Sequence, residues 1–399
     1  MADIAQQAAI NPASARNAAA ARARVPLTAI DPGQWRARAQ RAVEPNGYDL
    51  PAWELAVSAT ARGRNKASAL PAYDSSSTRL IGLMPVISLW RACKIPLPAL
   101  VSAHPYGTLC SPLIDRDAAI EAAARLLQQA RAAGAHALVL NDVALDGAAL
   151  NALRQVLSRD GLKPRVLSSY IRASLDATQA DETLLRDALG AKKLKELRRQ
   201  RHRLEEHGPV AFSVARRPDE IEPALETFLQ LEASGWKGKR GTALVQHAGD
   251  AAFIRRAVPA LAETAQCEII TLRAGTTPVA AGIVLRHQDR AFFFKLGIDE
   301  RFARYSPGVQ LTLELTRHLC ADAAIASADS TAGADHPMNN PIWRGRFAVG
   351  DVLIPLRRND PVVALIHTAL VGLNTAHETA RRVVRRLRDS AKATPPPGR

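Results

Sequence analysis

One stretch, Arg290–Asp329, constrains the fold more than any other part of the chain. It opens with a short, aromatic and apolar run, Ala291–Leu296, which is typical of a buried strand. Beyond a loop, apolar residues at helical spacing predict a helix from Val309 to about Ala321; they are Leu311, Leu315 and Leu319, with His318 among them. A second short strand, Ala324–Ala326, then leads to Asp329. This order of strand, loop, helix and strand predicts an α/β unit.

The start of the predicted helix has the features of an anion site. Ser306 suits the N-cap, Pro307 the first turn, and Gly308 lets a ligand approach the backbone closely. A helix N-terminus presents unpaired N–H groups and the positive end of the helix dipole to a phosphate or pyrophosphate. An ordinary helix start would use the same residues, so this pattern alone leaves both interpretations open.

Composition limits the class of partner. The chain has 399 residues, enough for two domains, and its 47% hydrophobic content supports a substantial core. A net charge of +15 predicts affinity for anions: nucleic acid, acidic protein, phosphorylated ligand or anionic membrane. The charge does not choose among them.

The cysteines and the apolar runs bear on location. The four cysteines are scattered, without a metal-binding spacing, which favours free thiols in a reducing, cytoplasmic compartment; they are Cys93, Cys110, Cys267 and Cys320. No apolar run approaches the ~20 residues that span a bilayer, and no signal-peptide core is visible. We therefore expect neither a bound metal nor a transmembrane segment.

Four segments follow from the pattern along the chain. Residues 1–43 are rich in Ala and Arg and predict a disordered basic leader. Residues 44–178 and 179–358 each read as an α/β block, and 359–399 as a helix with a basic, disordered tail. A Ser-Pro turn, helix and short strand ending at Asp recur in both blocks, at Ser111–Asp142 and Ser306–Asp329. The expected fold is α/β, with two tandem lobes, each a mixed sheet flanked by helices.

A basic helix is predicted over residues 181–207. Seven of the twelve residues in Lys192–Arg203 are Lys or Arg. This is either a solvated charged face or an anion-facing wall beside the site. A stand-alone nucleic-acid arm is less favoured, because no aromatic side chains are interleaved for base stacking.

Three segments together carry a family resemblance: Lys192–Glu206, Glu232–Gly238 (EASGWKG) and Lys295–Gly308 (KLGIDERFARYSPG). Over roughly residues 180–345 the chain resembles the GNAT-type acyltransferases, in particular the two-lobed CelD-like branch associated with cellulose biosynthesis. The same two-lobed fold resembles the Fem-type peptidoglycan aminoacyltransferases, which use aminoacyl-tRNA.

The resemblance implies a sheet whose middle strands splay apart around an acyl-CoA. The pantetheine would pair with the exposed strand at Phe294 and Leu296, and the pyrophosphate would cap the next helix at Ser306, Gly308, Val309 and Gln310. A carrier-protein phosphopantetheine or an aminoacyl-tRNA would present a similar anion, so these donors stay open.

Acyl transfer to an amine needs a proton acceptor, a donor to the carbonyl oxygen and a proton for the leaving thiolate. Glu232 and Asp329 are the candidate bases, Tyr305 the candidate acid, and Lys295 an unusual charge in an apolar strand. Each has a structural alternative. Glu232 could be a solvated carboxylate and Asp329 a turn-forming residue, while Tyr305 could be a loop tyrosine and Lys295 a lysine on the outer face of the strand. Four residues are candidates for substrate binding: Trp236, Lys237, Asp299 and His336. For Asp299 a structural ion pair with Arg301 or Lys295 is favoured, and His336 could also act as a base.

These observations predict an N-acyltransferase that moves an acyl group, most simply acetyl, from acyl-CoA to the amine of a small molecule or saccharide by direct attack. One alternative is a Fem-like transferase that uses aminoacyl-tRNA. Another is a non-catalytic component of exopolysaccharide synthesis, docked through its arginine-rich tail. An acidic carrier protein is a possible partner in the first case, and nucleic acid in the second.

Overall fold

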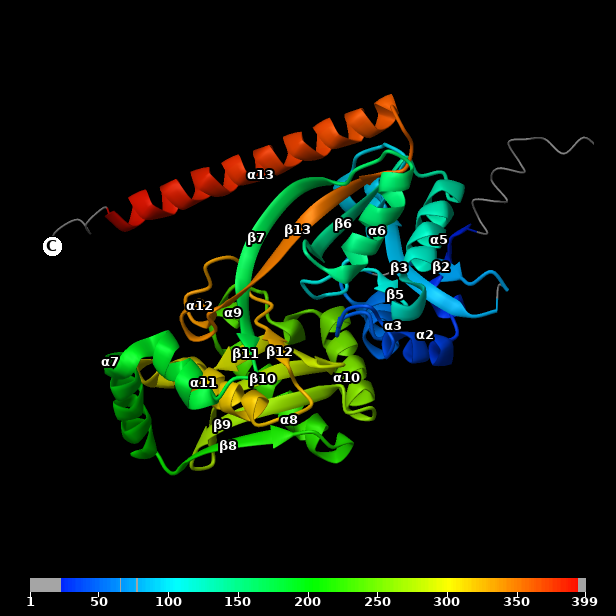
Figure 1. Ribbon diagram of the computed structural model, residues 1–399. Helices are drawn as coiled ribbons and strands as arrows, with labels where there is room; N and C mark the ends of the chain where they lie inside the picture. Colours follow the sequence, from blue (N-terminus) through cyan, green and yellow to red (C-terminus); the bar gives the residue numbers. More distant parts are fainter. Residues whose placement is uncertain (1–22, 65, 77, 394–399) are drawn as a thin grey trace, which may run out of the picture.

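The computed structural model describes residues 23–64, 66–76 and 78–393 and consists of one large mixed sheet flanked by helices (Figure 1). The N-terminal lobe supplies strands β1 (Val25–Pro26), β2 (Ser68–Tyr73), β3 (Leu80–Ser88), β4 (Ala99–Ser102), β5 (Leu113–Ile114), β6 (Ala137–Ala144) and β7 (Arg165–Asp176). Its helices are α2 (Pro32–Ala39), α3 (Pro51–Thr60), α4 (Leu89–Cys93), α5 (Ala119–Ala132) and α6 (Ala148–Arg159).

The C-terminal lobe begins with α7 (Asp181–Glu205), which is interrupted at Gly190, where φ is 71°. Its strands are β8 (Val210–Ala215), β9 (Cys267–Ala274), β10 (Thr277–His287), β11 (Arg290–Ile298), β12 (Ser327–Asp329) and β13 (Gly345–Pro355). Its helices are α8 (Pro218–Ser234), α9 (Trp236–Lys239), α10 (Ala248–Ala262), α11 (Pro307–Cys320), α12 (Asn339–Ile342) and α13 (Pro361–Ala393), with a 3₁₀ segment, η4, at Glu300–Tyr305.

The two lobes repeat one unit. Strand β4 runs parallel to β6 with α5 between them in sequence, and β11 runs parallel to β12 with α11 between them. Strands β9, β10 and β11 are antiparallel neighbours. The predicted α/β fold with two tandem lobes is therefore confirmed, because the helical and strand periods along the sequence are strong wherever an element has one buried face.

The lobes exchange their last strands. The strand order is β1-β2-β3-β4-β6-β13-β7-β12-β11-β10-β9-β8, so β13 pairs with β6 of the N-terminal lobe and β7 pairs with β12 of the C-terminal lobe. Strands β7 and β13 also pair with each other along most of their length. The sheet thus runs unbroken across the lobe boundary expected near residue 178, so that both lobes belong to one continuous hydrogen-bonded sheet.

The prediction of a disordered leader over residues 1–43 is wrong from Ala23 onward; its first 22 residues lie outside those described. Helix α2 packs against the core through Trp35 and Ala39, which are 1% and 0% exposed. Next to Trp35 on the helix, Arg38 forms an ion pair with the buried carboxylate of Asp115. The Ala- and Arg-rich composition concealed an amphipathic helix whose partners come from distant parts of the chain.

We expect Trp35→Ala to lower the free energy of unfolding by about 3–5 kcal/mol, the usual cost of deleting a buried tryptophan. The substitution also removes the hydrogen bond from the indole N–H to the carbonyl of Asp49, at 2.8 Å. Urea unfolding checks this, with Trp90→Ala as the matched control, since Trp90 is 53% exposed. Equal midpoints for the two variants would contradict the assignment of residues 23–43 to the fold.

The C-terminal helix is present as predicted. Val363, Ile366 and Leu370 of α13 are buried against β4 and β6, and Figure 1 shows the helix continuing past the sheet as a long rod. The tail at 394–399 lies outside the described residues. Among the helices described, none combines the length and apolarity needed to cross a membrane.

Candidate active site

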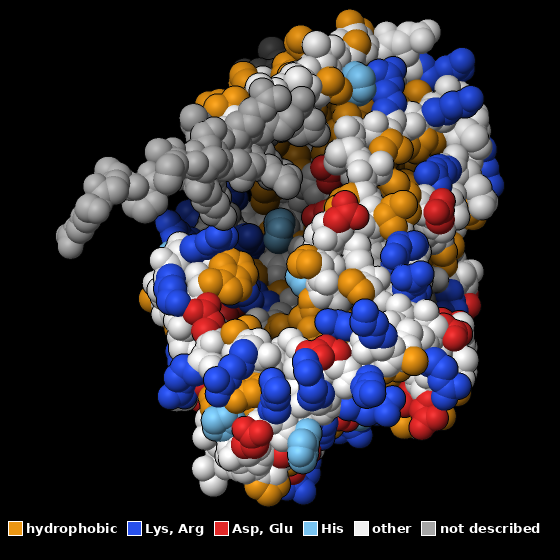
Figure 2. Space-filling model, turned by 90° about the vertical axis from the view of Figure 1, so that its left-hand side faces the viewer, with side chains coloured by type: hydrophobic (Ala, Val, Ile, Leu, Met, Phe, Trp, Pro, Cys, Tyr) orange, Lys and Arg blue, Asp and Glu red, His pale blue; other side chains and the backbone are white. Residues whose placement is uncertain are grey.

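A cleft of about 540 Å³ lies where the two lobes meet. Figure 2 shows this side of the molecule hollowed between its upper and lower parts, with Lys and Arg side chains gathered below the hollow. Polar residues of both lobes line the cleft: Arg64, His104, Tyr106 and Thr108 from the first, and Glu232, Trp236, Lys237, Lys295, Thr331, His336 and Asn339 from the second.

The cleft opens where β11 and β12 separate. Their parallel pairing extends only from Arg290↔Ser327 to Phe292↔Asp329. The register with β10 shifts at Phe294, a β-bulge, and β11 then stays paired with β10 from Lys295 to Ile298, while no described strand pairs with it on the β12 side. Residues 293–298 therefore form one wall of the cleft, as the resemblance implied for an exposed strand.

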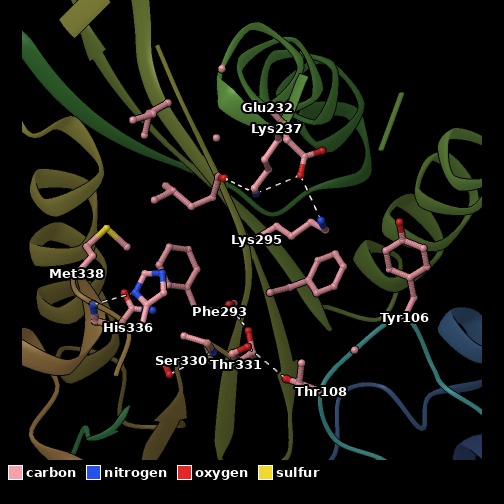
Figure 3. Close-up of a pocket in the computed structure, with 18 of the residues that line it drawn as sticks. Tyr106, Thr108, Glu232, Lys237, Phe293, Lys295, Ser330, Thr331, His336 and Met338 are labelled. Atoms are coloured by element: carbon pink, nitrogen blue, oxygen red, sulfur yellow. Dashed lines mark hydrogen bonds and ion pairs between the residues drawn. The ribbon is translucent and has the colours of Figure 1, made fainter. Parts of the chain in front are cut away.

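Glu232 lies in the last turn of α8 and holds two lysines (Figure 3). Its Oε1 accepts hydrogen bonds from Lys237 Nζ and Lys295 Nζ, both at 3.2 Å, and its Oε2 accepts one from Leu244 N at 2.9 Å. The carboxylate is buried, and Lys237 also donates to the carbonyl of Leu296 at 3.0 Å. The arrangement ties α8, α9 and β11 together at one end of the cleft.

This cluster requires a glycine at position 297. A side chain there would place its Cβ 2.8 Å from the backbone nitrogen of Glu232 and 3.2 Å from Leu231. Because β11 can approach α8 only without that atom, Gly297 sets the distance between the strand and the carboxylate. Burial, and then the neighbouring charge of Lys295, lower the pKa of Lys237, although Glu232 opposes this effect.

Two histidines in the cleft are held in one tautomer. His336 Nδ1 accepts a hydrogen bond from Asn339 N at 3.3 Å, and His104 Nδ1 accepts from Tyr106 N at 3.1 Å and from Arg64 Nε at 3.2 Å. Since each Nδ1 is an acceptor, the proton of each neutral ring lies on Nε2.

Both rings favour the neutral form. Burial and then Lys237 lower the pKa of His336. His104 keeps part of its surface open to the cleft, yet desolvation by its surroundings and the charge of Arg64 lower its pKa to about 4. The two rings are therefore hydrogen-bond donors at neutral pH, which argues against His336 as a base.

Tyr106 forms the wall contributed by the first lobe. Its hydroxyl donates to Asp250 Oδ2 at 2.9 Å, and burial raises the pKa of that hydroxyl. The guanidinium of Arg64 lies 4.3 Å from the centre of the ring, and Lys295 Nζ lies 6.0 Å from the same centre. One aromatic ring thus faces a cation from each lobe.

Half of the residues singled out from the sequence meet in this cleft. They are Glu232, Trp236, Lys237, Phe294, Lys295, Leu296 and His336. The other seven lie outside its lining: Asp299, Tyr305, Ser306, Gly308, Val309, Gln310 and Asp329.

Three of the outside residues have evident structural partners. Asp329 forms a buried ion pair with Arg172, and Asp299 pairs with Arg301 at 2.6 Å, one of the two partners that the sequence left open. Tyr305 bonds to His207 Nε2 at 3.0 Å through its hydroxyl. The positions of Asp329 and Tyr305 therefore do not support the catalytic roles expected for them.

The start of α11 differs from the expected phosphate site. Pro307 does occupy the first turn, but Ser306 has a left-handed backbone (φ 53°, ψ 51°) and its side chain does not cap the helix. A Cβ at Gly308 would lie 3.0 Å from Leu296 Cδ2 and 3.3 Å from Met338 Sδ. Gln310 donates to the carbonyl of Leu197 in α7 at 2.8 Å. Side chains and a second helix thus pack around the site expected for pyrophosphate.

Sequence reasoning missed the contribution of the first lobe. Arg64, His104, Tyr106 and Gly107 were not among the residues singled out from the sequence. The sequence offers one signal, the turn-forming residues Pro105-Tyr106-Gly107. In the structure, a Cβ at Gly107 would lie 2.3 Å from the ring of Tyr48. That glycine therefore marks a close approach to an aromatic core.

Comparisons with known proteins bear on the fold. Residues 191–336 match the family model of the acetyltransferase (GNAT) domain. A crystal structure of FemX matches with a TM-score of 0.56 and 12% identity, over 85% of this chain and 98% of FemX. The C-terminal domain (DUF2156) of a protein described as a lysylphosphatidylglycerol synthetase, from Agrobacterium fabrum, matches with a TM-score of 0.52 and 15% identity, over 85% and 95%. No curated protein sequence matches significantly. Residues 191–336 thus resemble the acetyltransferase (GNAT) domain, within a two-lobed fold.

Proposed function

We propose that this protein is an N-acyltransferase that transfers an acyl group from acyl-CoA to an amine bound in the cleft between the lobes. The observation that carries the proposal is the separation of β11 from β12, which opens residues 293–298 onto a cleft ending at Glu232. The match of residues 191–336 to the acetyltransferase domain supports the same reaction class.

The chemistry is direct attack. The amine nitrogen attacks the thioester carbonyl carbon, the C–N bond forms, the C–S bond breaks, and the leaving thiolate takes up a proton. Glu232 is the one carboxylate among the described residues that line the cleft, so we assign it to accept the proton of the amine. His336, through its Nε2–H, is assigned as the hydrogen-bond donor to the developing negative charge of the carbonyl oxygen. Tyr305, the candidate acid, lies outside the cleft lining, so the thiolate takes its proton from solvent.

Phe294 and Leu296 line the cleft and remain the proposed contacts of the pantetheine. Because side chains and α7 pack around Gly308 and Gln310, we place the pyrophosphate at another part of the cleft. Trp236 at the rim is 50% exposed and has the guanidinium of Arg240 5.0 Å from its ring centre, so this pair is the proposed contact. The pyrophosphate contact at Ser306–Gln310 is accordingly not part of this proposal.

A second donor, aminoacyl-tRNA, is favoured by the surface of α7. Its exposed basic residues form a cationic face of the kind that binds a phosphate backbone: Lys192, Lys193, Lys195, Arg198, Arg199 and Arg203. Binding of tRNA that weakens steeply with added salt, together with transfer from the charged form, would favour this donor. The remaining alternative is a non-catalytic role in exopolysaccharide synthesis, which follows from the CelD-like resemblance. It predicts binding of neither acyl-CoA nor aminoacyl-tRNA.

Thermal unfolding with saturating acetyl-CoA or longer acyl-CoAs tests the proposal. A donor at ~100 times its Kd should stabilise the fold by about 2.7 kcal/mol. Ala332→Trp, which fills the cleft lining, should abolish that shift, whereas Ala321→Trp at the exposed end of α11 should keep it. An absence of any shift with every acyl-CoA in the wild type would overturn the acyl-CoA proposal and turn attention to charged tRNA.

A further inference from the structure

The charges in the cleft are unbalanced. Three of the described lining residues are cationic, Arg64, Lys237 and Lys295, against the single carboxylate of Glu232. That carboxylate is already used, because Oε1 accepts from both lysines and Oε2 accepts from the backbone of Leu244. The cleft therefore keeps an excess of positive charge that its own groups do not neutralise.

The lobes present this excess from both sides. Within the described part of the chain, the Arg64 guanidinium pairs with no carboxylate; it donates to His104 Nδ1 at 3.2 Å and to the carbonyl of Arg62 at 3.1 Å. The guanidinium carbon lies 4.3 Å from the centre of the Tyr106 ring, and Lys295 Nζ, from β11, lies 6.0 Å from the same centre. A guanidinium and an ammonium group that face one ring suit an oxyanion.

Nearby neutral groups have the same polarity. His104 and His336 each carry their proton on Nε2, so both are donors. The hydroxyls of Tyr106 and Thr331 differ: each gives its proton to a protein acceptor, Asp250 Oδ2 or the carbonyl of Phe293, and can only accept from a ligand. The two imidazole N–H groups add donors to those of Arg64 and Lys295, which favours a ligand group that accepts hydrogen bonds.

We propose that the amine acceptor carries an anionic group, a carboxylate or a phosphate, that binds between Arg64 of the first lobe and Lys295 of the second. This inference rests on the proposed function, since it names the substrate class of the same cleft. The anionic group anchors the acceptor at Tyr106, and its amine is directed toward Glu232 and the exposed edge of β11.

Matched pairs of amines test this inference. One pair is 6-aminohexanoate and 6-aminohexanamide, whose amines are alike and far from the group that differs; the other is glucosamine 6-phosphate and glucosamine. Isothermal calorimetry, which needs no turnover, should give at least tenfold tighter binding for the anionic member of one pair. The pair that responds distinguishes a carboxylate from a phosphate acceptor.

Variants locate the effect. Arg64→Gln should reduce the anionic preference about tenfold, and Arg64→Glu should abolish or reverse it. Arg217→Gln is the matched control, because Arg217 is an exposed arginine that pairs with Asp219 and Glu220 away from the cleft. The melting temperature of each variant confirms that it is folded.

The outcomes separate this inference from the proposed function. Equal binding of both members of each pair, or a preference that Arg64→Glu leaves intact, overturns the anionic acceptor. Acyl transfer to neutral amines in that case would leave the proposed function standing. Preferential binding of the anionic amine without transfer from any acyl-CoA would support the inference and contradict the proposed donor.

Discussion

Glu232→Gln is expected to lower kcat/KM for acyl transfer by about 10²–10⁴-fold, the range for loss of a general acid–base group. The amide keeps the shape of the side chain and can still accept from Leu244 N, but it cannot take up the proton of the amine. It also weakens the hold on Lys237 and Lys295, which both contact Oε1 at 3.2 Å. Steady-state rates of CoA release, with the best amine acceptor, measure the effect.

Glu226→Gln is the matched control for this variant. Glu226 is on the same helix but faces outward and pairs with Arg255 at 2.6 Å, so its loss should leave the rate unchanged. The acyl-CoA-induced thermal shift of Glu232→Gln should persist, since Glu232 is assigned to the proton transfer. A variant that turns over at the wild-type rate would remove Glu232 from the proposed mechanism.

Arg172→Met is expected to lower the free energy of unfolding by about 3–5 kcal/mol, because it leaves the carboxylate of Asp329 buried and unpaired. Arg172 is 0% exposed and Asp329 2%. The same guanidinium donates to the carbonyl of Thr108 at 2.6 Å and to the Tyr170 hydroxyl at 3.3 Å. Arg172, in β7, thus connects the end of β12 at Asp329 with the first-lobe loop that contains Thr108, a residue of the cleft lining.

The double variant Arg172→Met, Asp329→Leu separates a lost ion pair from a disturbed core. Removing both charges should recover part of the stability, since a buried pair replaced by apolar groups is often close to neutral. Urea midpoints of the wild type, the two single variants and the double variant form the complete cycle. If Asp329→Leu alone proves harmless, the two residues are not coupled and the assignment of Asp329 to structure rather than catalysis fails.

Local patterns accounted for much of the fold. The strand at Ala291–Leu296 could be predicted from a continuous apolar run, and the helix that follows it from apolar residues at helical spacing. Helix α2 shows the converse. Its Ala- and Arg-rich sequence resembles a disordered segment, and only Trp35 and Ala39, set against the distant core, make it part of the structure.

The candidate site residues also divide into those that the tertiary structure brings together and those that it does not. Glu232, Trp236, Lys237, Phe294, Lys295, Leu296 and His336 meet in one cleft. Ser306 and Gly308 had the local chemistry of a phosphate site, yet α7 and the side chains of Leu296 and Met338 pack around that helix start. A capping pattern predicts where a helix begins, but access to its end depends on which other element covers it.

The sequence by itself determined the repeated strand–helix–strand unit, the basic character and the charged residues near the end of α8 and in β11, because these follow from residue type and spacing. Only the tertiary structure decided that β7 and β13 exchange between the lobes, that Arg64 and Tyr106 face Lys295, and that Asp329 pairs with Arg172. The contacts between the lobes join residues more than a hundred positions apart. They depend on strand register and packing of the whole sheet, which no local period encodes.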